Sequence, residues 1–366
     1  EDVGGVRLLV AEVQATSQDA LREIGDELRR VLGPSLLILG AVTGDRPAFV
    51  IRRPPDVRPA LAALRQRLAP WRLLPALRRR RGKDLVVLLP EPPPLRTRWQ
   101  LNLLLFIATL GTTFWAGYQQ AAFLVREGYL RNAVDGALAF SLPLMAILLT
   151  HEMGHKVTSV IRGIRASLPY FIPLPPLPTA LPIGTLGAVI VTRSPAPDRN
   201  GLMDLGASGP LAGFLVAIPV LIYGIRHSFV LEALAGPLVS IPDPLLVRWL
   251  TALLLHPPDG AIILGHPTYW AGWIGLLVTS LNLLPASMLD GGHAVRAALG
   301  PERHRVISYL AVAVALALGY IPMAILILLF NPRGHPGPLD DLTPLSRTRL
   351  LIGLVLVAIF AVSAVP

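Results

Sequence analysis

Several segments of close to 20 consecutive, mainly apolar residues limit the folds open to this chain more than any other feature. A helix of about 20 apolar residues crosses a hydrocarbon core about 30 Å thick and satisfies its own backbone hydrogen bonds. Hydrophobic residues make up 53% of the chain and charged residues only 15%, a balance that is rare among soluble globular proteins. The sequence therefore predicts a mainly α-helical, polytopic membrane protein.

We expect six membrane-spanning helices, joined by loops that hold most of the charged residues. Their expected bounds are Trp99 to Tyr118, Gly136 to His155, Gly206 to Gly224, Tyr269 to Asp290, Val306 to Phe330, and Leu350 to Val365. The apolar stretch from Leu245 to Leu255 is too short to span and is expected at the interface or in a loop. With six spans, the N-terminus and the C-terminus would share one side of the membrane.

Basic residues are distributed unevenly over the two sides of this arrangement. The N-terminal side carries most of them, including Arg78 to Arg81, Lys156 and Arg162, whereas the opposite side carries fewer, with Arg347 and Arg349 among them. Cytoplasmic loops carry an excess of Lys and Arg, so the N-terminal side is predicted to be cytoplasmic, in a bacterial inner membrane. The net charge of +10 fits this orientation, and nucleic-acid binding is not expected because no basic patch with interleaved aromatic residues is present.

The first 90 residues lack such apolar segments and predict a small soluble α/β domain. Alternating apolar residues predict strands in VRLLVAEVQA, on both sides of a turn at Thr43-Gly44-Asp45, and in DLVVLLP. Helices are expected in SQDALREIGDELRRVLG and from Asp56 to Leu68. The order β-α-β-β-α-β matches a ferredoxin-like sandwich, for which we expect a regulatory or docking role.

A proline-rich linker, residues 91–98, is expected to separate this domain from a membrane domain over residues 99–366. Within the membrane domain, a core that carries the polar motifs described below is expected at about residues 134–299. No signal peptide is apparent before the first strand. The soluble domain would then stand outside the bilayer, on the side that is predicted to be cytoplasmic.

A cluster of ionisable residues, LLTHEMGHKV, follows directly after one of the most apolar stretches. His151 and His155 are four residues apart, so both imidazoles share a helix face and can reach one zinc ion, with Glu152 beside them. The chain has no cysteine, so nitrogen and oxygen atoms must bind any metal. Ionisable residues are expensive within a membrane, which favours a metal site over an ordinary interfacial turn.

A catalytic zinc usually has three protein ligands and one open position. The best candidate for the third ligand is Asp290 in LNLLPASMLDGGH, which is expected to end the fourth helix at the same depth as the histidines. Asn282 is eight residues earlier and can lie on the same face, with Pro285 loosening the helix between them. Asn282 could contact a substrate or brace the kink, and both interpretations stay open.

Two distant motifs, HEMGH and NLLPASMLDGG, together resemble those of the site-2 protease family of intramembrane zinc metalloproteases. The segments YFIPLPPLP, IGTLGAVI and GASGPLAGF are also similar to that family, especially to its branch with a cytoplasmic N-terminal domain. The resemblance covers roughly Leu95 to Leu299, and no PDZ-like insertion is seen. Lys156, Thr158 and Ser159 stand where relatives often carry an aromatic residue and alanines, a difference that bears on helix packing and substrate range.

The resemblance implies one zinc ion per chain, held by His151, His155 and Asp290. It also implies that Glu152 is the general base and that transmembrane helices of other proteins are the substrates. The chemistry needs a base beside the metal, because a zinc-activated water must give up a proton as it attacks a peptide carbonyl. Asn282 is the candidate for a hydrogen bond to the substrate backbone or to the developing oxyanion.

Two further segments fit this picture, and the second is expected to form a hairpin or re-entrant loop near the site. Gly206, Gly209 and Gly213 are spaced so that the third helix can pack closely on another helix. Prolines exclude a spanning helix in FIPLPPLPTALPIG, and Leu186 to Thr192 favours β structure. An exposed edge strand there could hold an unwound substrate in an extended conformation.

Two other functions compete with a site-2-type protease. A different membrane zincin would need a glutamate ligand on a later helix, but Glu232 and Glu302 lie outside the predicted later spans. A metal transporter would place acidic or histidine residues along several helices across the membrane midplane, whereas here they cluster at one end. A non-proteolytic scaffold is the remaining alternative. The oligomeric state and the identity of the substrate are not specified by the sequence.

Overall fold

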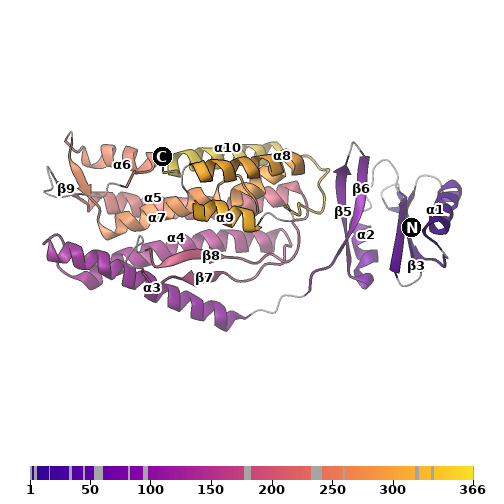
Figure 1. Cartoon of the computed structure of the whole chain (residues 1–366), viewed down its shortest axis with the longest axis horizontal. Coiled ribbons are helices and arrows are strands. Elements are labelled where there is room, and N and C mark those ends of the chain that lie inside the picture. The colour runs from indigo at the N-terminus through magenta and orange to yellow at the C-terminus, as the bar shows by residue number, and fades with distance from the viewer. Residues whose placement is uncertain are drawn as a thin grey trace. The chain divides into compact units, whose positions relative to one another are not determined.

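The computed structural model describes most of the chain, in two compact units (Figure 1). The described residues are 2–3, 6–15, 17–32, 35–43, 46–52, 61–80, 83–93, 98–176, 183–231, 241–258, 260–317, 321–330 and 334–365. One unit comprises Glu1–Pro92 and Leu339–Leu342, and the other comprises Pro93–Pro338 and Thr343–Pro366. The expected turn at Gly44-Asp45, the start of the expected second helix at Asp56, and most of the linker lie outside the described residues.

In its described residues, the N-terminal unit contains a four-stranded sheet, a separate hairpin and two α-helices. Its elements are β1 (Asp2–Val3), β2 (Val6–Glu12), α1 (Gln18–Leu32), β3 (Ser35–Thr43), β4 (Arg46–Arg52), α2 (Leu61–Leu68), a short 3-10 turn (Ala69–Trp71), β5 (Leu73–Arg80) and β6 (Lys83–Pro90). Alternate side chains of β3 point to opposite faces, so Leu36 and Ile38 pack with Leu64 and Leu68, whereas Leu39 packs with Leu21.

The strand order of this unit differs from the ferredoxin-like order that the sequence predicts. Strands β2 and β3 pair directly and in parallel, from Arg7 opposite Ser35 to Glu12 opposite Gly40, and β5 and β6 form a hairpin of their own. In a ferredoxin-like sandwich a third strand separates the two strands of each β-α-β unit. The described part of this unit has the α/β character that the sequence predicts. Alternation of apolar residues predicts which face of a strand is buried, but it does not predict which strands pair with one another.

A short segment from near the end of the chain, Leu339–Leu342, belongs to this same unit. The N–H of Leu77 in β5 donates to the carbonyl oxygen of Leu339 at 2.7 Å, and the N–H of Asp341 donates to the carbonyl oxygen of Leu77 at 3.2 Å. These bonds form a parallel bridge between Leu77 and Asp340, and Leu342 packs against the apolar core. The edge of β5 is therefore covered by this segment.

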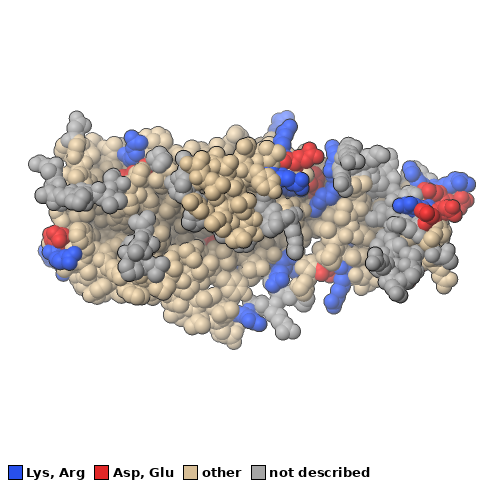
Figure 2. All heavy atoms as spheres, in the orientation of Figure 1, with Lys and Arg blue, Asp and Glu red and all other residues tan. Residues whose placement is uncertain are grey.

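The second unit is mainly helical, with helices that run alongside one another (Figure 1). Its elements are α3 (Trp99–Arg126), α4 (Ala133–Ile161), β7 (Tyr170–Pro173), β8 (Thr185–Val189), α5 (Arg199–Arg226), β9 (Phe229–Leu231), α6 (Leu245–Leu255), β10 (Ile262–Leu264), α7 (Pro267–Asn282), α8 (Asp290–Ala317), α9 (Ile321–Phe330) and α10 (Arg347–Ser363). Among the described residues, α3, α4 and α5 are long and apolar enough to cross a membrane. Figure 2 shows long stretches of the face in view without charged side chains, as expected for an integral membrane protein.

The fourth and fifth expected spans are divided differently in the structure. Helix α7 ends at Asn282, irregular turns follow, and Asp290 begins α8 instead of ending the preceding helix. Pro285 cannot continue a helical hydrogen-bond ladder, and Ser287 has a left-handed backbone with φ of 51°. The fifth expected span is made of α8 and α9, and α8 itself is kinked at Gly300, where φ is 83°. The six-span arrangement is therefore not reproduced in this form.

Helix α5 holds the centre of the second unit, packed against α4, α7, α8 and α10. Large side chains fill one core cluster around it, among them Phe140 and Leu144 of α4, Leu221 of α5 and Leu276 of α7. Each of these four side chains is buried. The helix can approach its neighbours closely because glycines lie at its contacts, and this positions the ends of four other helices.

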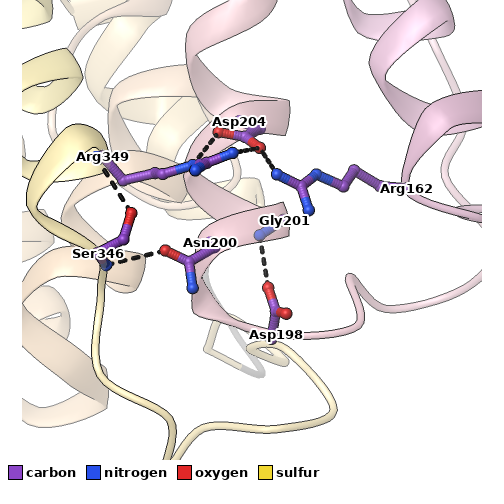
Figure 3. Close-up of polar contacts among 7 residues, drawn as sticks. All are labelled: Arg162, Asp198, Asn200, Gly201, Asp204, Ser346 and Arg349. Atoms are coloured by element: carbon purple, nitrogen blue, oxygen red, sulfur yellow. Dashed lines mark hydrogen bonds and ion pairs between the residues drawn. The ribbon is translucent and has the colours of Figure 1, made fainter.

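A group of polar contacts joins three helix ends (Figure 3). Asp204 of α5 pairs with Arg162, at the C-terminal end of α4, and with Arg349, in the first turn of α10. Nearby, the N–H of Ser346 donates to Oδ1 of Asn200 at 2.9 Å. The start of α10 thus lies at the same end of the bundle as the end of α4 and the start of α5.

This pairing corrects the predicted sidedness of the last helix. The sequence predicts that Arg349 lies across the membrane from Arg162, yet both guanidinium groups contact one carboxylate. A single crossing in the α8 and α9 region would put the start of α10 on the side of the membrane opposite Arg162. The contacts of Asp204 instead require that the chain returns to the side of Arg162 before α10 begins. The C-terminal end of α10 then lies at the opposite face from Arg162, and Arg347 and Arg349 join the side with more basic residues.

Candidate metal centre

Helix α4 places His151, Glu152 and His155 in the interior of the membrane unit, where all three are buried. The spacing of four residues brings the two imidazoles to one face, as the sequence predicts. Their rings meet edge to face, and their Nε2 atoms lie 3.3 Å apart. Two nitrogen donors therefore point at the same small volume.

Asp290 reaches this volume from the first residue of α8. Its Oδ2 lies 3.2 Å from Nε2 of His151, and its Oδ1 lies 3.2 Å from Nε2 of His155. Ligand atoms of these three residues all lie within 4.8 Å of one another. The structure thus brings together the three residues that the sequence analysis named as ligands, although Asp290 comes from a different helix than expected.

The hydrogen bond of His155 to the backbone prepares it for metal binding. Its Nδ1 lies 2.8 Å from the carbonyl oxygen of Leu205, which can only accept, so Nδ1 carries the ring proton. In neutral His155 the lone pair of Nε2 lies beside a carboxylate oxygen of Asp290, so that both atoms can bind one cation. Two imidazoles and one carboxylate form a donor set suited to zinc, so these residues fit the ion.

Glycines of α5 make room for these ligands. A Cβ at Gly209 would overlap the ring of His155, and a Cβ at Gly213 would lie 3.1 Å from the Cβ of His151. One turn earlier, a Cβ at Gly206 would lie 2.6 Å from the carbonyl oxygen of Asp290. The spacing of these glycines predicts close helix packing, and the structure confirms it, but the spacing alone does not reveal that the packed groups are the candidate ligands.

A cavity of about 230 Å³ opens beside the ligands. Glu152 lines this cavity, together with Ala188 and Val189 of β8. Asn282, the last residue of α7, also lines it, and its side-chain amide lies 3.3 Å from Nε2 of His151. Of the two interpretations that the sequence left open for Asn282, this position favours a place in the site over a brace for the following turn.

Two histidines that the sequence analysis did not single out lie next to this cavity. His293 lines it, and Nδ1 of His293 lies 2.6 Å from Nε2 of His335. His293 follows Asp290 by three residues at the start of α8, a spacing that places both on one helix face and that could have been noticed.

Comparisons with known proteins agree with this arrangement. The chain is 29% identical over 303 residues to probable zinc metalloprotease EGY1, chloroplastic, of Arabidopsis thaliana. The matched region covers 74% of this chain and 54% of that protein. It is 32% identical over 176 residues to the EGY1 protein of Oryza sativa subsp. japonica, covering 46% of this chain and 29% of that protein. It is 30% identical over 240 residues to the EGY2 protein of Oryza sativa subsp. indica, covering 62% of this chain and 41% of that protein.

The chain spans about half the length of the Arabidopsis relative and less of the other two. The names of these relatives place them in chloroplasts and give no support to the bacterial inner membrane that the sequence analysis expected. No solved structure matches the chain. A family comparison matches residues 139–329, more than half of the 366 residues, and the chain therefore belongs to peptidase family M50, the site-2 protease family that its motifs resemble.

Proposed function

We propose that this protein is an intramembrane zinc metalloprotease that hydrolyses peptide bonds in or near transmembrane helices of other proteins. One observation carries the proposal: the ligand atoms of His151, His155 and Asp290 converge within 4.8 Å of one another beside a cavity that Glu152 also lines. A carboxylate next to a three-ligand site with room for water and substrate is the arrangement that metal-assisted hydrolysis requires. Membership of the family and the zinc metalloprotease names of the relatives support the same function.

Glu152 is the proposed general base. A zinc ion held by His151, His155 and Asp290 would supply a water of lowered pKa and would polarise the peptide carbonyl. Glu152 accepts a proton from the attacking water as its oxygen bonds to the carbonyl carbon. Glu152 then gives that proton to the amide nitrogen, and the carbon–nitrogen bond breaks. Two termini result, and the carboxylate of Glu152 is restored.

Strand β8 is the proposed platform for the substrate. It pairs with β7 through Val189 opposite Tyr170 and Ala188 opposite Phe171, and in the described chain β7 is its only partner strand. Leu186 is exposed, while Ala188 and Val189 line the cavity. An unwound substrate segment could add to this edge through main-chain hydrogen bonds. Asn282, which also lines the cavity, would donate a hydrogen bond to the substrate backbone.

We further propose that the side of Arg162 and Asp204 is the cytoplasmic or equivalent side, because it gathers most of the basic residues. The N-terminal unit is proposed to be a regulatory or docking module. Transmembrane proteins are the proposed substrates and the bilayer the proposed environment, and nucleic acid is not expected as a partner.

The test separates metal binding from chemistry with one isosteric change. Glu152→Gln keeps the size of the side chain and removes the proton acceptor. The probe is a synthetic single-span peptide of about 20 mainly apolar residues, with a glycine pair that loosens the helix and a fluorophore and quencher at its ends, in proteoliposomes. We call it the quenched test helix. Its cleavage should fall by about 10²- to 10⁴-fold in Glu152→Gln, with zinc content unchanged.

Glu127→Gln is the matched control, because Glu127 lies at the far end of α3, away from the site. It should cleave the quenched test helix as the wild type does. Asp290→Ala and His155→Ala should lose zinc, measured by mass spectrometry of the intact protein. A transporter or a scaffold would bind zinc without cleaving the peptide, and cleavage at the wild-type rate by Glu152→Gln would remove Glu152 from the mechanism.

A further inference from the structure

His335 forms a hydrogen bond with His293 at one ring nitrogen of His293, Nδ1. Nδ1 of His293 lies 2.6 Å from Nε2 of His335, and the two rings meet nearly at right angles with centroids 4.9 Å apart. His293 also lines the cavity that contains Glu152 and Asp290. Because Nδ1 is engaged by His335, Nε2 is the ring nitrogen of His293 that remains available to a group bound in the cavity.

The backbone of Gly337 determines where His335 carries its proton. The N–H of Gly337 lies 2.9 Å from Nδ1 of His335. A backbone N–H can only donate, so this Nδ1 accepts and neutral His335 has its proton on Nε2. That proton is donated to Nδ1 of His293, and neutral His293 therefore has its own proton on Nε2. Among the described residues, none forms a hydrogen bond with this Nε2–H.

The loop that carries His335 is fixed against α8. Gly337 has a left-handed backbone with φ of 71°, and a Cβ there would overlap the guanidinium of the buried Arg296. The ring of His304 lies 5.3 Å from that of His335, and Nε2 of His304 lies 3.1 Å from the carbonyl oxygen of Ser287. The orientation of His335, and with it the tautomer of His293, is thus built into the packing.

We propose that His293 is a further catalytic residue, whose Nε2–H donates to the carbonyl oxygen of the scissile peptide bond, and that His335 is the positioning residue that fixes this tautomer. The proposal rests on the protease function proposed above. As the water oxygen bonds to the carbonyl carbon, the electron pair of the C–O double bond moves onto oxygen. The hydrogen bond from Nε2 strengthens with that charge, and no proton is transferred to the oxygen.

Substitutions of His293 distinguish a donor at Nε2 from a merely structural ring. His293→Leu removes the donor and should lower kcat on the quenched test helix by about 10²- to 10³-fold, with KM and zinc content nearly unchanged. His293→Gln places an amide N–H close to the position of Nε2 and should recover most of that rate. His293→Asn places its amide near the position of Nδ1 and should not.

The tautomer is measured independently of activity. With ¹⁵N-labelled histidine in the zinc-loaded wild type, NMR should show His293 protonated at Nε2 and unprotonated at Nδ1, assigned by loss of the signal in His293→Gln. His335→Leu should convert this signal into a mixture of tautomers and lower kcat by about 10-fold. His335→Gln can still donate to Nδ1 of His293 and should restore both the signal and the rate.

Each outcome decides the proposal. Protonation of His293 at Nδ1 in the wild type, or an unchanged kcat in His293→Leu, would overturn it. Loss of zinc from His293→Leu would also overturn it, since the ring would then support the metal site instead of the substrate. If the wild type cleaved no test helix, the protease function and this catalytic role would fall together, whereas the NMR result would still decide whether the tautomer is as described.

Discussion

The imidazole of His155 occupies the space that Gly209 leaves open on α5. A Cβ at Gly209 would overlap Nε2 of the ring, the atom that faces Asp290, so the two side chains cannot coexist in this arrangement. Gly213 stands in a looser relation to His151, at 3.1 Å. The geometry of the candidate metal centre therefore depends on a helix that supplies no ligand to it.

Gly209→Ala should displace His155 and lower zinc affinity by about 10-fold or more, because the support of a ligand is changed while the ligand remains. Gly213→Ala should have a smaller effect. Gly353→Ala is the control, since a Cβ there would make only an ordinary contact of 3.5 Å with Met203. Zinc content after equilibration with a buffered free-zinc series measures the effect. Wild-type affinity in Gly209→Ala would contradict the packing argument.

Cysteine labelling on this cysteine-free chain tests the corrected sidedness of α10. Thr348, in the first turn of α10, and Glu302, after the kink in α8, are both exposed. Thr348→Cys and Glu302→Cys should react with a membrane-impermeant reagent from the same side, and Glu127→Cys from the other side. If Thr348→Cys reacted together with Glu127→Cys, the original arrangement would be right, and the contacts of Asp204 would not exist in the membrane.

Asp204→Asn should destabilise the helical unit, because one carboxylate pairs with two guanidinium groups that would lose their partner. The three side chains are partly exposed, at 27% for Arg162, 30% for Arg349 and 17% for Asp204, so we expect about 1–3 kcal/mol rather than the larger value for a fully buried pair. Thermal unfolding in detergent measures the change. The exposed Asp135→Asn is the control and should unfold like the wild type.

Stability should depend on the protonation of His266, which caps α7. The N–H of Thr268 donates to Nδ1 of His266, and burial, with a smaller effect of His227, lowers the pKa of His266 from 6.5 to about 4. Below pH 6.5 the unfolded chain binds this proton and the folded chain does not, so stability declines as the pH falls towards 4 and levels off below it.

His266→Asn isolates that contribution, because Asn can accept the same capping hydrogen bond and does not titrate. The variant should lose part of the decline in thermal midpoint between pH 7 and pH 4 that the wild type shows. Identical pH profiles for the two proteins would mean that His266 titrates alike in the folded and unfolded chains.

The ligand set was accessible from the sequence because its geometry is local. His151 and His155 are one helical turn apart, and any helix brings them together. The sequence identifies Asp290 as a candidate ligand because it is a carboxylate in an apolar region. The sequence does not show which helix carries Asp290, because the helix ends near Pro285 and the left-handed Ser287 although the residues around them are still apolar. An apolar segment predicts which residues lie within the membrane, but it does not predict where a helix ends.

The other parts of the site depend on long-range contacts that no local pattern encodes. His335 meets His293 from 42 residues further along the chain, after α8 and α9 have intervened. Arg349 likewise lies 145 residues from Asp204, and its side of the membrane follows from the path of everything between them. The order of strands in the N-terminal unit also depends on pairing between segments whose apolar alternation is the same.

Because the segment Leu339–Leu342 belongs to the N-terminal unit, this unit cannot be completed during synthesis until that segment has been made. Arg78 of β5 donates to the carbonyl oxygen of Leu339, a residue made 261 positions later. The strands of this unit are thus made before the helical unit, but the unit is completed only after most of the helical unit has been synthesised. Until Leu339–Leu342 emerges, β5 offers an open strand edge of the kind that pairs with other chains. During translation the edge of β5 is therefore exposed for as long as it takes to synthesise the helical unit. It is covered once the four residues Leu339–Leu342 have been made.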